Sequence, residues 1–146
     1  MLNMEEWGDK YLIGIEQLDE HHKHLYDLLR ESYDLLVLKN NNDGRIGKVL
    51  DSMSDYATYH ISTEEDWMHD LKYPKQTEHT QEHLEFVHRV SEFSNNFKNG
   101  TEHLTLEIVT FLREWLVNHI MTLDKEFAAF ISNEARFCEM TASKYH

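Results

Sequence analysis

The chain of 146 residues has only one cysteine, one proline and five glycines. A single cysteine, Cys138, cannot build an internal disulfide framework and suits a reducing compartment, so we expect a cytoplasmic protein. So few prolines and glycines argue against a loop-rich or all-β chain. No stretch approaches the ~20 apolar residues of a membrane span. The first residues carry no apolar run with a basic flank, so we expect no signal peptide.

Basic side chains are also scarce: 14 lysines and arginines stand against 27 aspartates and glutamates, which gives a formal net charge of −13. Nucleic acid and anionic membrane surfaces attract basic patches, so neither is an expected partner. What the chain does have is eleven histidines, many for this length. The length fits one domain. A domain of this size buries roughly two-thirds of its unfolded surface and needs no covalent cross-link to fold.

Apolar side chains recur at steps of three and four residues in four segments, so each segment predicts an amphipathic helix. The segments cover about residues 19–39, 46–67, 79–97 and 104–120. Asparagine, glycine and proline interrupt helices, and they form the breaks between the segments. These breaks are Asn40–Gly44, Tyr73–Pro74 and Asn99–Gly100.

Four helices with short breaks predict an all-α fold, an up-down-up-down four-helix bundle. In a single domain, an N-terminal arm (1–18) would precede the bundle (about 19–120), and a C-terminal helix and tail (121–146) would follow it. Asp19 and Thr101 are predicted to cap the first and fourth helices. The short C-terminal helix is predicted around Lys125–Ile131. No apolar stripe is left over for an interface, so we expect a monomer.

Several polar side chains lie on the apolar stripes rather than opposite them. Burying an imidazole or a carboxylate costs free energy unless the group is hydrogen-bonded or coordinated. One such histidine would be an ordinary core residue, but five groups on three of the four stripes point to a shared site. They are His60, Glu64, His79, His83 and His119. Five other histidines are expected to be solvated: His24, His69, His88, His103 and His146.

The topology brings these groups to one end of the bundle. In an antiparallel bundle, the starts of the first and third helices lie beside the ends of the second and fourth. His22 stands at the start of the first helix, and Asp124 follows the end of the fourth. The opposite half of each stripe is almost purely apolar. Seven groups therefore converge: His22, His60, Glu64, His79, His83, His119 and Asp124.

The spacings suit metal binding, because ligands four residues apart project from one helix face. Two pairs have this spacing, His60 with Glu64 and His79 with His83. His119 and Asp124 are five apart, and at about 100° per residue they would point roughly 140° apart on a regular helix. We therefore predict that the helix loosens or bulges between them, as helices often do at functional sites.

Seven ligands exceed the needs of one ion, so the set implies two. Imidazole suits iron, zinc, copper and nickel, whereas carboxylate oxygens suit harder ions. Glu64 and Asp124 each have two oxygens and could bridge the ions. Two carboxylates and one hydroxide against two divalent ions leave about one net positive charge, which a low-dielectric core tolerates. So few anions favour reversible chemistry over oxygen activation, because they stabilise high-valent iron poorly.

These motifs resemble the hemerythrin family, and its bacterial single-domain members in particular. The resemblance covers roughly residues 5–131. Lys72 departs from it by replacing a common turn glycine. Each motif alone is weak, but all of them in order at these separations are specific. The motifs are Trp7, Tyr11 and Gly14-Ile15; Leu18-Asp19-Glu20-His21-His22-Lys23; His60-Ile61-Ser62-Thr63-Glu64-Glu65 with Met68; Tyr73-Pro74; His79-x-x-x-His83-x-x-Phe86; and Trp115-Leu116-x-x-His119-Ile120 with Asp124.

The resemblance implies two iron ions (Fe2+/Fe3+), one coordinatively full and one with an open position where dioxygen binds. The implied ligands are His79, His83 and His119 for the first ion, His22 and His60 for the second, and Glu64, Asp124 and an oxo or hydroxo group as bridges. The implied function is reversible dioxygen binding by an oxygen carrier, store or supply protein, which is not an enzyme.

The resemblance also implies an apolar oxygen pocket, in which Leu116 would help to exclude water and slow autoxidation. Trp115 and Ile61 would line the same pocket. Ile61 stands where the family commonly has phenylalanine, which would alter access to the pocket. His21 stands where glutamine is usual. The helical phases of His21 and His22 both suit the stripe, so the residues leave the choice open and only the family register selects His22.

Two rival classes of metal site share part of the pattern. His79-Thr80-Gln81-Glu82-His83 matches the histidine-x-x-glutamate-histidine motif of inverted zinc proteases, but the other groups stay unexplained and such proteases need a larger chain. A ferritin-like di-iron oxidase uses glutamates with two glutamate-x-x-histidine pairs. Only one clear helical pair of that kind stands here, Glu85-x-x-His88, and it lies off the apolar stripe.

Other roles for the same centre stay open. It could sense oxygen, nitric oxide or redox state through a separate partner, store iron, or handle peroxide, and weak oxidase or peroxidase side activity is compatible with it. An oxygen carrier would also meet an oxygen-consuming enzyme or a reductase as partner.

Overall fold

Five α-helices make up most of the computed structural model, which describes residues 6–38, 43–100, 103 and 105–134. A 3-10 turn precedes the first helix and a π-helical turn joins the last two, and the described residues include no strand. In chain order the elements are η1 (Asp9–Tyr11), α1 (Glu16–Leu38), α2 (Asp43–Asp70), α3 (Gln76–Lys98), α4 (Leu106–His119), η2 (Ile120–Asp124) and α5 (Lys125–Ser132).

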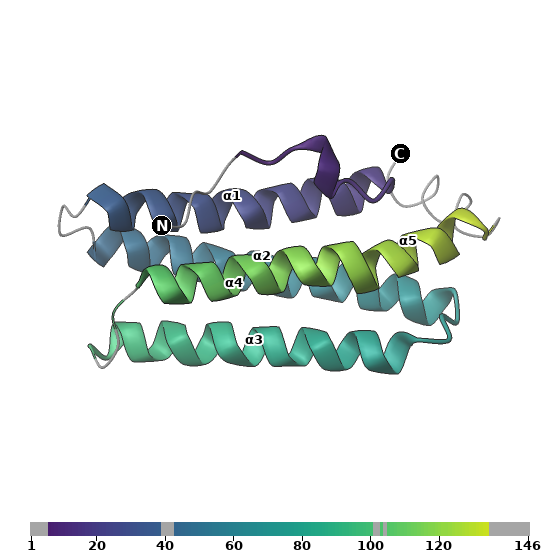
Figure 1. The fold of residues 1–146 in the computed structure, drawn as a ribbon. Coiled ribbons are helices and arrows are strands. Elements are labelled where there is room, and N and C mark those ends of the chain that lie inside the picture. Colours follow the sequence, from purple (N-terminus) through teal and green to yellow (C-terminus); the bar gives the residue numbers. More distant parts are fainter. Residues whose placement is uncertain (1–5, 39–42, 101–102, 104, 135–146) are drawn as a thin grey trace.

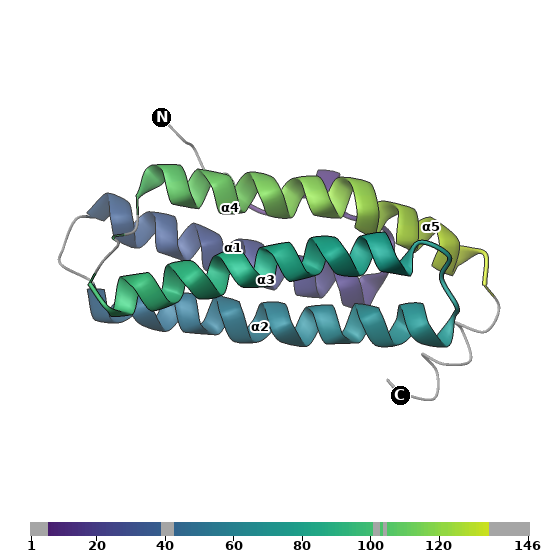
Figure 2. The ribbon, with the colours of Figure 1, turned by 90° about the horizontal axis from the view of Figure 1, so that it is seen from below.

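The four long helices lie side by side and alternate in direction, with each connection joining neighbours at one end of the bundle (Figures 1 and 2). The arm containing η1 lies along α1 in Figure 1. The predicted up-down-up-down bundle is therefore confirmed. None of the described helices combines the length and the apolar character that crossing a membrane requires.

The core consists of two apolar clusters with a polar layer between them. In α2, Met53 and Ala57 belong to the larger cluster, and Trp67 and Met68 to the smaller one. Helix α1 follows the same scheme, with Leu18 in the smaller cluster and residues from 25 onward in the larger, whereas α3 contributes only to the larger cluster. The positions between the two clusters are those of the polar groups singled out above, so the site is covered by apolar side chains on both sides.

The helix starts differ from the prediction. Helix α1 begins at Glu16, and Asp19 lies within its first turn instead of capping it. The Asp19 carboxylate reaches back to the arm, where it accepts hydrogen bonds from the backbone N–H groups of Ile13 (2.8 Å) and Gly14 (3.2 Å). Gly14 has φ +93°, a conformation that glycine adopts without strain. The first helix therefore begins three residues earlier, and Asp19 fixes the turn of the arm.

The fourth helix also differs from the prediction in its limits. The predicted cap, Thr101, lies outside the described residues, and α4 is capped by Thr105, whose Oγ1 accepts from the N–H of Ile108 at 3.2 Å. The predicted boundary near residue 120 falls inside one continuous helical run from Leu106 to Ser132, formed by α4, η2 and α5. The predicted short helix, Lys125–Ile131, is α5 itself.

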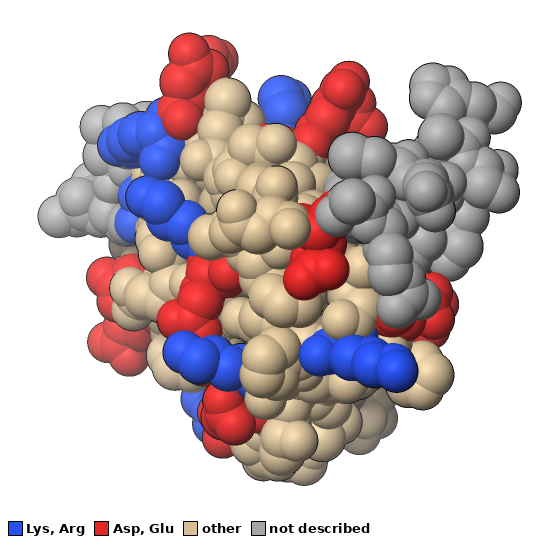
Figure 3. Space-filling view, turned by 90° about the vertical axis from the view of Figure 1, so that its right-hand side faces the viewer, with Lys and Arg blue, Asp and Glu red and all other residues tan. Residues whose placement is uncertain are grey.

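Figure 3 shows the end of the bundle where α2 connects to α3. On this face basic and acidic side chains are interspersed among neutral ones, outside the grey residues. The acidic excess of the chain therefore does not gather into a patch of one sign on this view.

The turn after α2 is closed by a non-glycine residue in the left-handed region. Lys72 has φ +55°. The N–H of Tyr73 donates to the carbonyl of Met68 (2.9 Å) and that of Lys72 to the carbonyl of His69 (3.2 Å), the pattern of a Schellman helix end. Glycine is the usual residue at this position because a Cβ costs free energy there.

We expect Lys72→Gly to raise the free energy of unfolding by roughly 1 kcal/mol, because it removes the left-handed strain of a side-chain-bearing residue. Urea denaturation of the metal-free protein measures the change. Lys48→Gly, on the exposed face of α2, is the matched control and should lower stability by about the same amount. A loss of stability in Lys72→Gly would show that the turn is not strained.

Candidate metal centre

Seven polar side chains from four helical elements meet in the layer between the two apolar clusters. Each is at most 4% exposed, and together they are the seven predicted from the sequence. Helix α1 contributes His22; α2 contributes His60 and Glu64; α3 contributes His79 and His83; and the α4–η2 run contributes His119 and Asp124.

The ligand atoms form two overlapping groups, within each of which all atoms lie no more than 4.8 Å apart. Glu64 and Asp124 belong to both groups. The larger group adds three histidines and the smaller adds two: His79, His83 and His119 in the first, His22 and His60 in the second. Two carboxylates shared between two sets of imidazoles is the arrangement expected for a pair of bridged ions.

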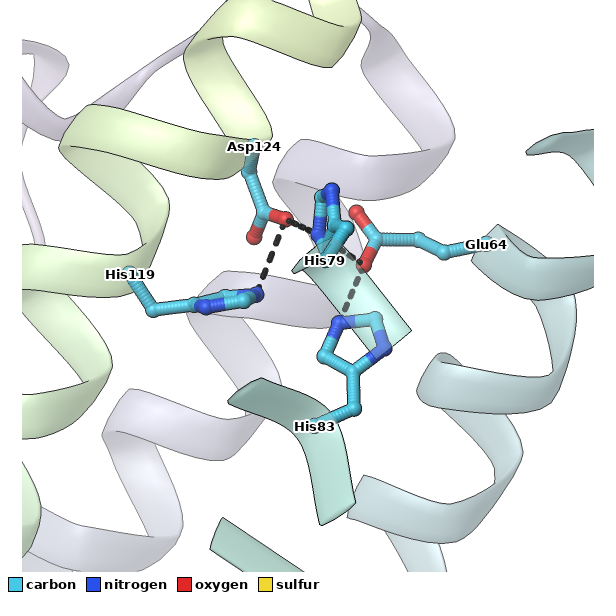
Figure 4. Close-up of side chains that lie close together, drawn as sticks. All are labelled: Glu64, His79, His83, His119 and Asp124. Carbon is cyan, nitrogen blue, oxygen red and sulfur yellow. Dashed lines mark hydrogen bonds and ion pairs between the residues drawn. The ribbon is translucent and has the colours of Figure 1, made fainter. Parts of the chain in front are cut away.

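Asp124 stands at the centre of three histidines from three helices (Figure 4 shows two of them). Its Oδ1 lies 2.7 Å from Nε2 of His79 and 3.2 Å from Nε2 of His119. Its Oδ2 lies 2.9 Å from Nε2 of His22. One carboxylate thus contacts histidines of both groups through different oxygens.

Glu64 makes the second shared contact, and it does so through one oxygen. Its Oε1 lies 3.0 Å from Nε2 of His83, 3.4 Å from Nε2 of His60 and 3.5 Å from Nε2 of His79. All five histidines therefore turn the same ring nitrogen, Nε2, toward the carboxylates.

The π-helical turn η2 explains how His119 and Asp124 meet although they are five residues apart. A π-turn widens the helix by one residue, so the side chain at i+5 returns to the face of residue i. The N–H of the next residue, Lys125, accordingly bonds to the carbonyl of Ile120, five residues back. The predicted loosening of the fourth helix is confirmed.

Several atoms of the cluster are buried without a hydrogen bond, although they lie close to one another. The short distances at these atoms do not have hydrogen-bond geometry, and an unsatisfied buried polar atom costs about 1–3 kcal/mol. Metal coordination would satisfy all of them at once, so the donor set fits a pair of ions. These inward-facing atoms are Nε2 of His22, His83 and His119, both carboxylate oxygens of Glu64, and Oδ2 of Asp124; Nδ1 of His22 and of His79, on the outer sides of their rings, also make no hydrogen bond.

Charge balance in the metal-free cluster points to the same role. Burial alone would lower the pKa of His79, but its hydrogen bond to Asp124 and the nearby Glu64 carboxylate outweigh burial and raise the pKa to about 10. Burial would raise the pKa of Glu64, and so would Asp124, yet His60, His79 and His83 hold it at about 2. Protons on imidazoles thus balance the buried carboxylates, and metal ions could replace those protons.

The outer ring nitrogens, Nδ1, have partners of their own on three histidines. These contacts fix the orientation of each ring, as the second shell of a metal site does. The pairs are His60 Nδ1 with His21 Nδ1 (2.9 Å), His83 Nδ1 with Glu65 Oε2 (3.1 Å) and His119 Nδ1 with Glu82 Oε1 (2.8 Å).

The adjacent histidines of α1, which the sequence could not tell apart, take different places. His22 has its Nε2 in the cluster, whereas the ring of His21 contacts the far side of His60. Burial, with the nearby His22, lowers the pKa of His21. His21 had no role in the sequence analysis beyond that ambiguity. Glu65 and Glu82 had no outer-partner role there either, although each stands directly beside a stripe position, Glu64 or His83.

The structure does not support the protease-like motif or the ferritin-like pair as a metal site. Glu82, the glutamate of the protease-like motif, hydrogen-bonds to the outer nitrogen of His119 instead of facing the cluster. Glu85 and His88, the ferritin-like pair, are both exposed. Of the five histidines expected to be solvated, His24, His69, His88 and His103 are exposed, and His146 lies outside the described residues.

A small cavity of about 10 Å³ adjoins the cluster. That is roughly the room of one water molecule. Its walls include the three predicted pocket residues, Ile61, Trp115 and Leu116, beside His60 and His83 of the cluster. The Trp115 ring also stacks on His119, with ring centroids 4.8 Å apart and planes at 10°.

Known proteins resemble this chain in sequence and in fold. A family model described as the hemerythrin HHE cation binding domain matches residues 13–131. Bacteriohemerythrins of Stenotrophomonas maltophilia and Methylococcus capsulatus are each 31% identical to the chain, covering 84% and 78% of it and 78% and 86% of their own lengths. A crystal structure of wild-type hemerythrin superposes with a TM-score of 0.80 at 27% identity, covering 87% of this chain and 97% of that one.

The fold and the site together define a four-helix-bundle protein with a buried histidine–carboxylate cluster that fits a di-iron centre. The family match extends over all seven groups of the cluster and over the helices that carry them. The chain belongs to the hemerythrin family.

We expect metal binding to release protons, because the Nε2 of His79 must lose its proton before it can bind an ion. The pKa of about 10 means that this proton is present throughout the neutral range, so zinc affinity should rise as the pH rises toward 10. Calorimetric zinc titrations of the metal-free protein in buffers of different ionisation enthalpy measure the release.

The exposed His88 supplies the control for this titration, since His88→Asn should release as many protons as the unaltered chain. A binding enthalpy that is the same in every buffer would contradict the raised pKa.

Proposed function

We propose that the chain binds dioxygen reversibly at a non-haem di-iron centre and serves as an oxygen carrier, store or supply protein. The observation that supports this most strongly is the pair of ligand groups that share Glu64 and Asp124. When bound, the iron pair would supply two electrons to dioxygen and recover them on its release.

The proposed ligands follow the two groups. Three histidines would hold one ion and two the other, so the second ion would have a coordination position to spare. Glu64 and Asp124, whose oxygens lie among both sets of imidazoles, would bridge the ions together with an oxygen from solvent. The assignment is His79, His83 and His119 to the first ion and His22 and His60 to the second.

The chain's own residues would exclude water and hold the ligand. The cavity beside His60 is lined by Leu25, Ala57 and Leu116, and its surface is almost entirely apolar. A small apolar molecule loses little by entering such a space, whereas water loses its hydrogen bonds. The buried cluster itself gives substrates larger than a diatomic molecule no room, which favours binding over enzymatic turnover.

Reversible oxygenation is tested with the iron-loaded protein. After anaerobic reduction we expect exposure to air to produce charge-transfer absorption in the visible range, and evacuation to remove it over repeated cycles. Metal analysis should give two irons per chain.

The outcome separates the proposed role from its alternatives. Colour that never reverses would contradict oxygen carriage while leaving the di-iron centre in place, and it would favour iron storage or peroxide handling. Reversible binding with an affinity that changes when a partner protein is added would favour sensing. Protein without iron that cleaves peptides in the presence of zinc would contradict the proposal as a whole.

Leu116→Ala should shorten the lifetime of the oxygenated form severalfold. Removing the side chain enlarges the cavity beside the cluster and admits water, which promotes autoxidation. The decay of the visible absorption in air measures the lifetime.

Leu112→Ala is the matched control for Leu116→Ala. Leu112 is equally buried one turn earlier in α4 but does not line that cavity. Both variants should lose roughly 2–5 kcal/mol of stability, and only Leu116→Ala should oxidise faster. Equal lifetimes in the two variants would show that Leu116 does not protect the site.

A further inference from the structure

The histidines of the two groups differ in what their outer nitrogens contact. In the three-histidine group, Nδ1 of His83 and His119 each contact a carboxylate, that of Glu65 or Glu82. In the two-histidine group, Nδ1 of His60 contacts the neutral ring of another histidine, His21, at 2.9 Å. The Nδ1 atoms of His22 and His79 make no hydrogen bond with any residue that the structure describes.

The direction of the His21–His60 hydrogen bond follows from the role of His60. A histidine that binds metal through Nε2 needs its lone pair on that atom, so its single ring proton sits on Nδ1. Nδ1–H of His60 must then donate, and Nδ1 of His21 must accept. His21 consequently carries its own proton on Nε2.

The surroundings of His21 hold its ring in the position that accepting requires. His21 is next to His22 near the start of α1, and it is only 4% exposed. Its ring packs edge-on against Tyr56, with centroids 5.6 Å apart and planes at 85°, and lies 5.1 Å from the ring of Tyr59. A buried ring with aromatic neighbours on two sides cannot easily leave its partner, since cores are close-packed.

We propose that His21 is the positioning residue of the two-histidine half of the centre: it accepts the Nδ1 proton of His60 and so fixes the His60 Nε2 lone pair toward the metal. This rests on the proposed di-iron function. His21 is an uncharged acceptor, whereas His83 and His119 each face a carboxylate, so His60 is a less basic ligand than either of them. The affinity of this half of the centre therefore depends on residue 21.

The first test uses the zinc-loaded protein. Nitrogen NMR reports which ring nitrogen of each histidine carries the proton. We expect His60, whose Nε2 lone pair binds the ion, to carry its proton on Nδ1, and His21 to carry its proton on Nε2. A proton on Nδ1 of His21, which would leave that atom unable to accept from His60, would overturn the proposal.

The second test measures zinc affinity by competition with a chromophoric chelator. Loss of a second-shell partner costs roughly 10- to 100-fold in metal affinity, and we expect His21→Leu to weaken the second zinc ion by that factor while leaving the first unchanged. His21→Gln restores an acceptor and should bring the affinity back to within a few-fold of the unaltered chain. His24→Leu, an exposed residue on the same helix, should bind as the unaltered chain does.

The outcomes separate this proposal from the proposed function. If the unaltered chain binds no second zinc ion, the two-metal centre itself is wrong. If it binds two and His21→Leu also binds two with equal affinity, only the role of His21 is wrong. If His21→Leu cannot bind the second ion at all while His22→Ala can, His21 is a ligand and not a positioning residue. Circular dichroism of each metal-free variant separates these results from misfolding.

Discussion

Two carboxylates buried without solvent, Glu64 and Asp124, are the constraint on which the rest of the structure depends. A buried anion is costly unless a cation or several donors face it, and breaking such a pairing costs more than it ever contributes. Five imidazoles face these two carboxylates, each through its Nε2 atom. Protons on this donor set balance the charge of the buried carboxylates, and metal ions in their place would satisfy the inward-facing atoms that otherwise make no hydrogen bond.

The bundle places that polar layer where water cannot reach it. Along α1 and α2 the chain passes from one apolar cluster through the polar layer to the other, and α4 does the same through η2 and α5. The layer therefore lies near one end of the bundle but not at its surface, because Trp67 and Phe127 cover it on the far side. The same burial raises the strength of every electrostatic contact in the cluster, since the effective dielectric constant falls away from water.

The parts of the site that repeat with helix periodicity could be predicted, and those that depend on how a side chain turns could not. His60 and Glu64 share a face because they are four residues apart, and the five-residue step from His119 to Asp124 required the π-turn that is present. Asp19 was misassigned as a helix cap because its sequence position suits either a cap or the turn of the arm that it stabilises. The roles of His21, Glu65 and Glu82 depend on rotamers across helix boundaries, which no spacing within one helix encodes.

The division of outer partners has a physical reason in where each one lies. The side chains of Glu65 and Glu82 are 33% and 37% exposed, so solvent stabilises their charges while they still reach His83 and His119. His21 is 4% exposed, and a carboxylate in its place would add a third buried anion beside Glu64 and Asp124. A neutral ring accepts the same proton without that desolvation penalty. The two halves of the centre thus receive acceptors of different strength because one edge of the cluster meets water and the other does not.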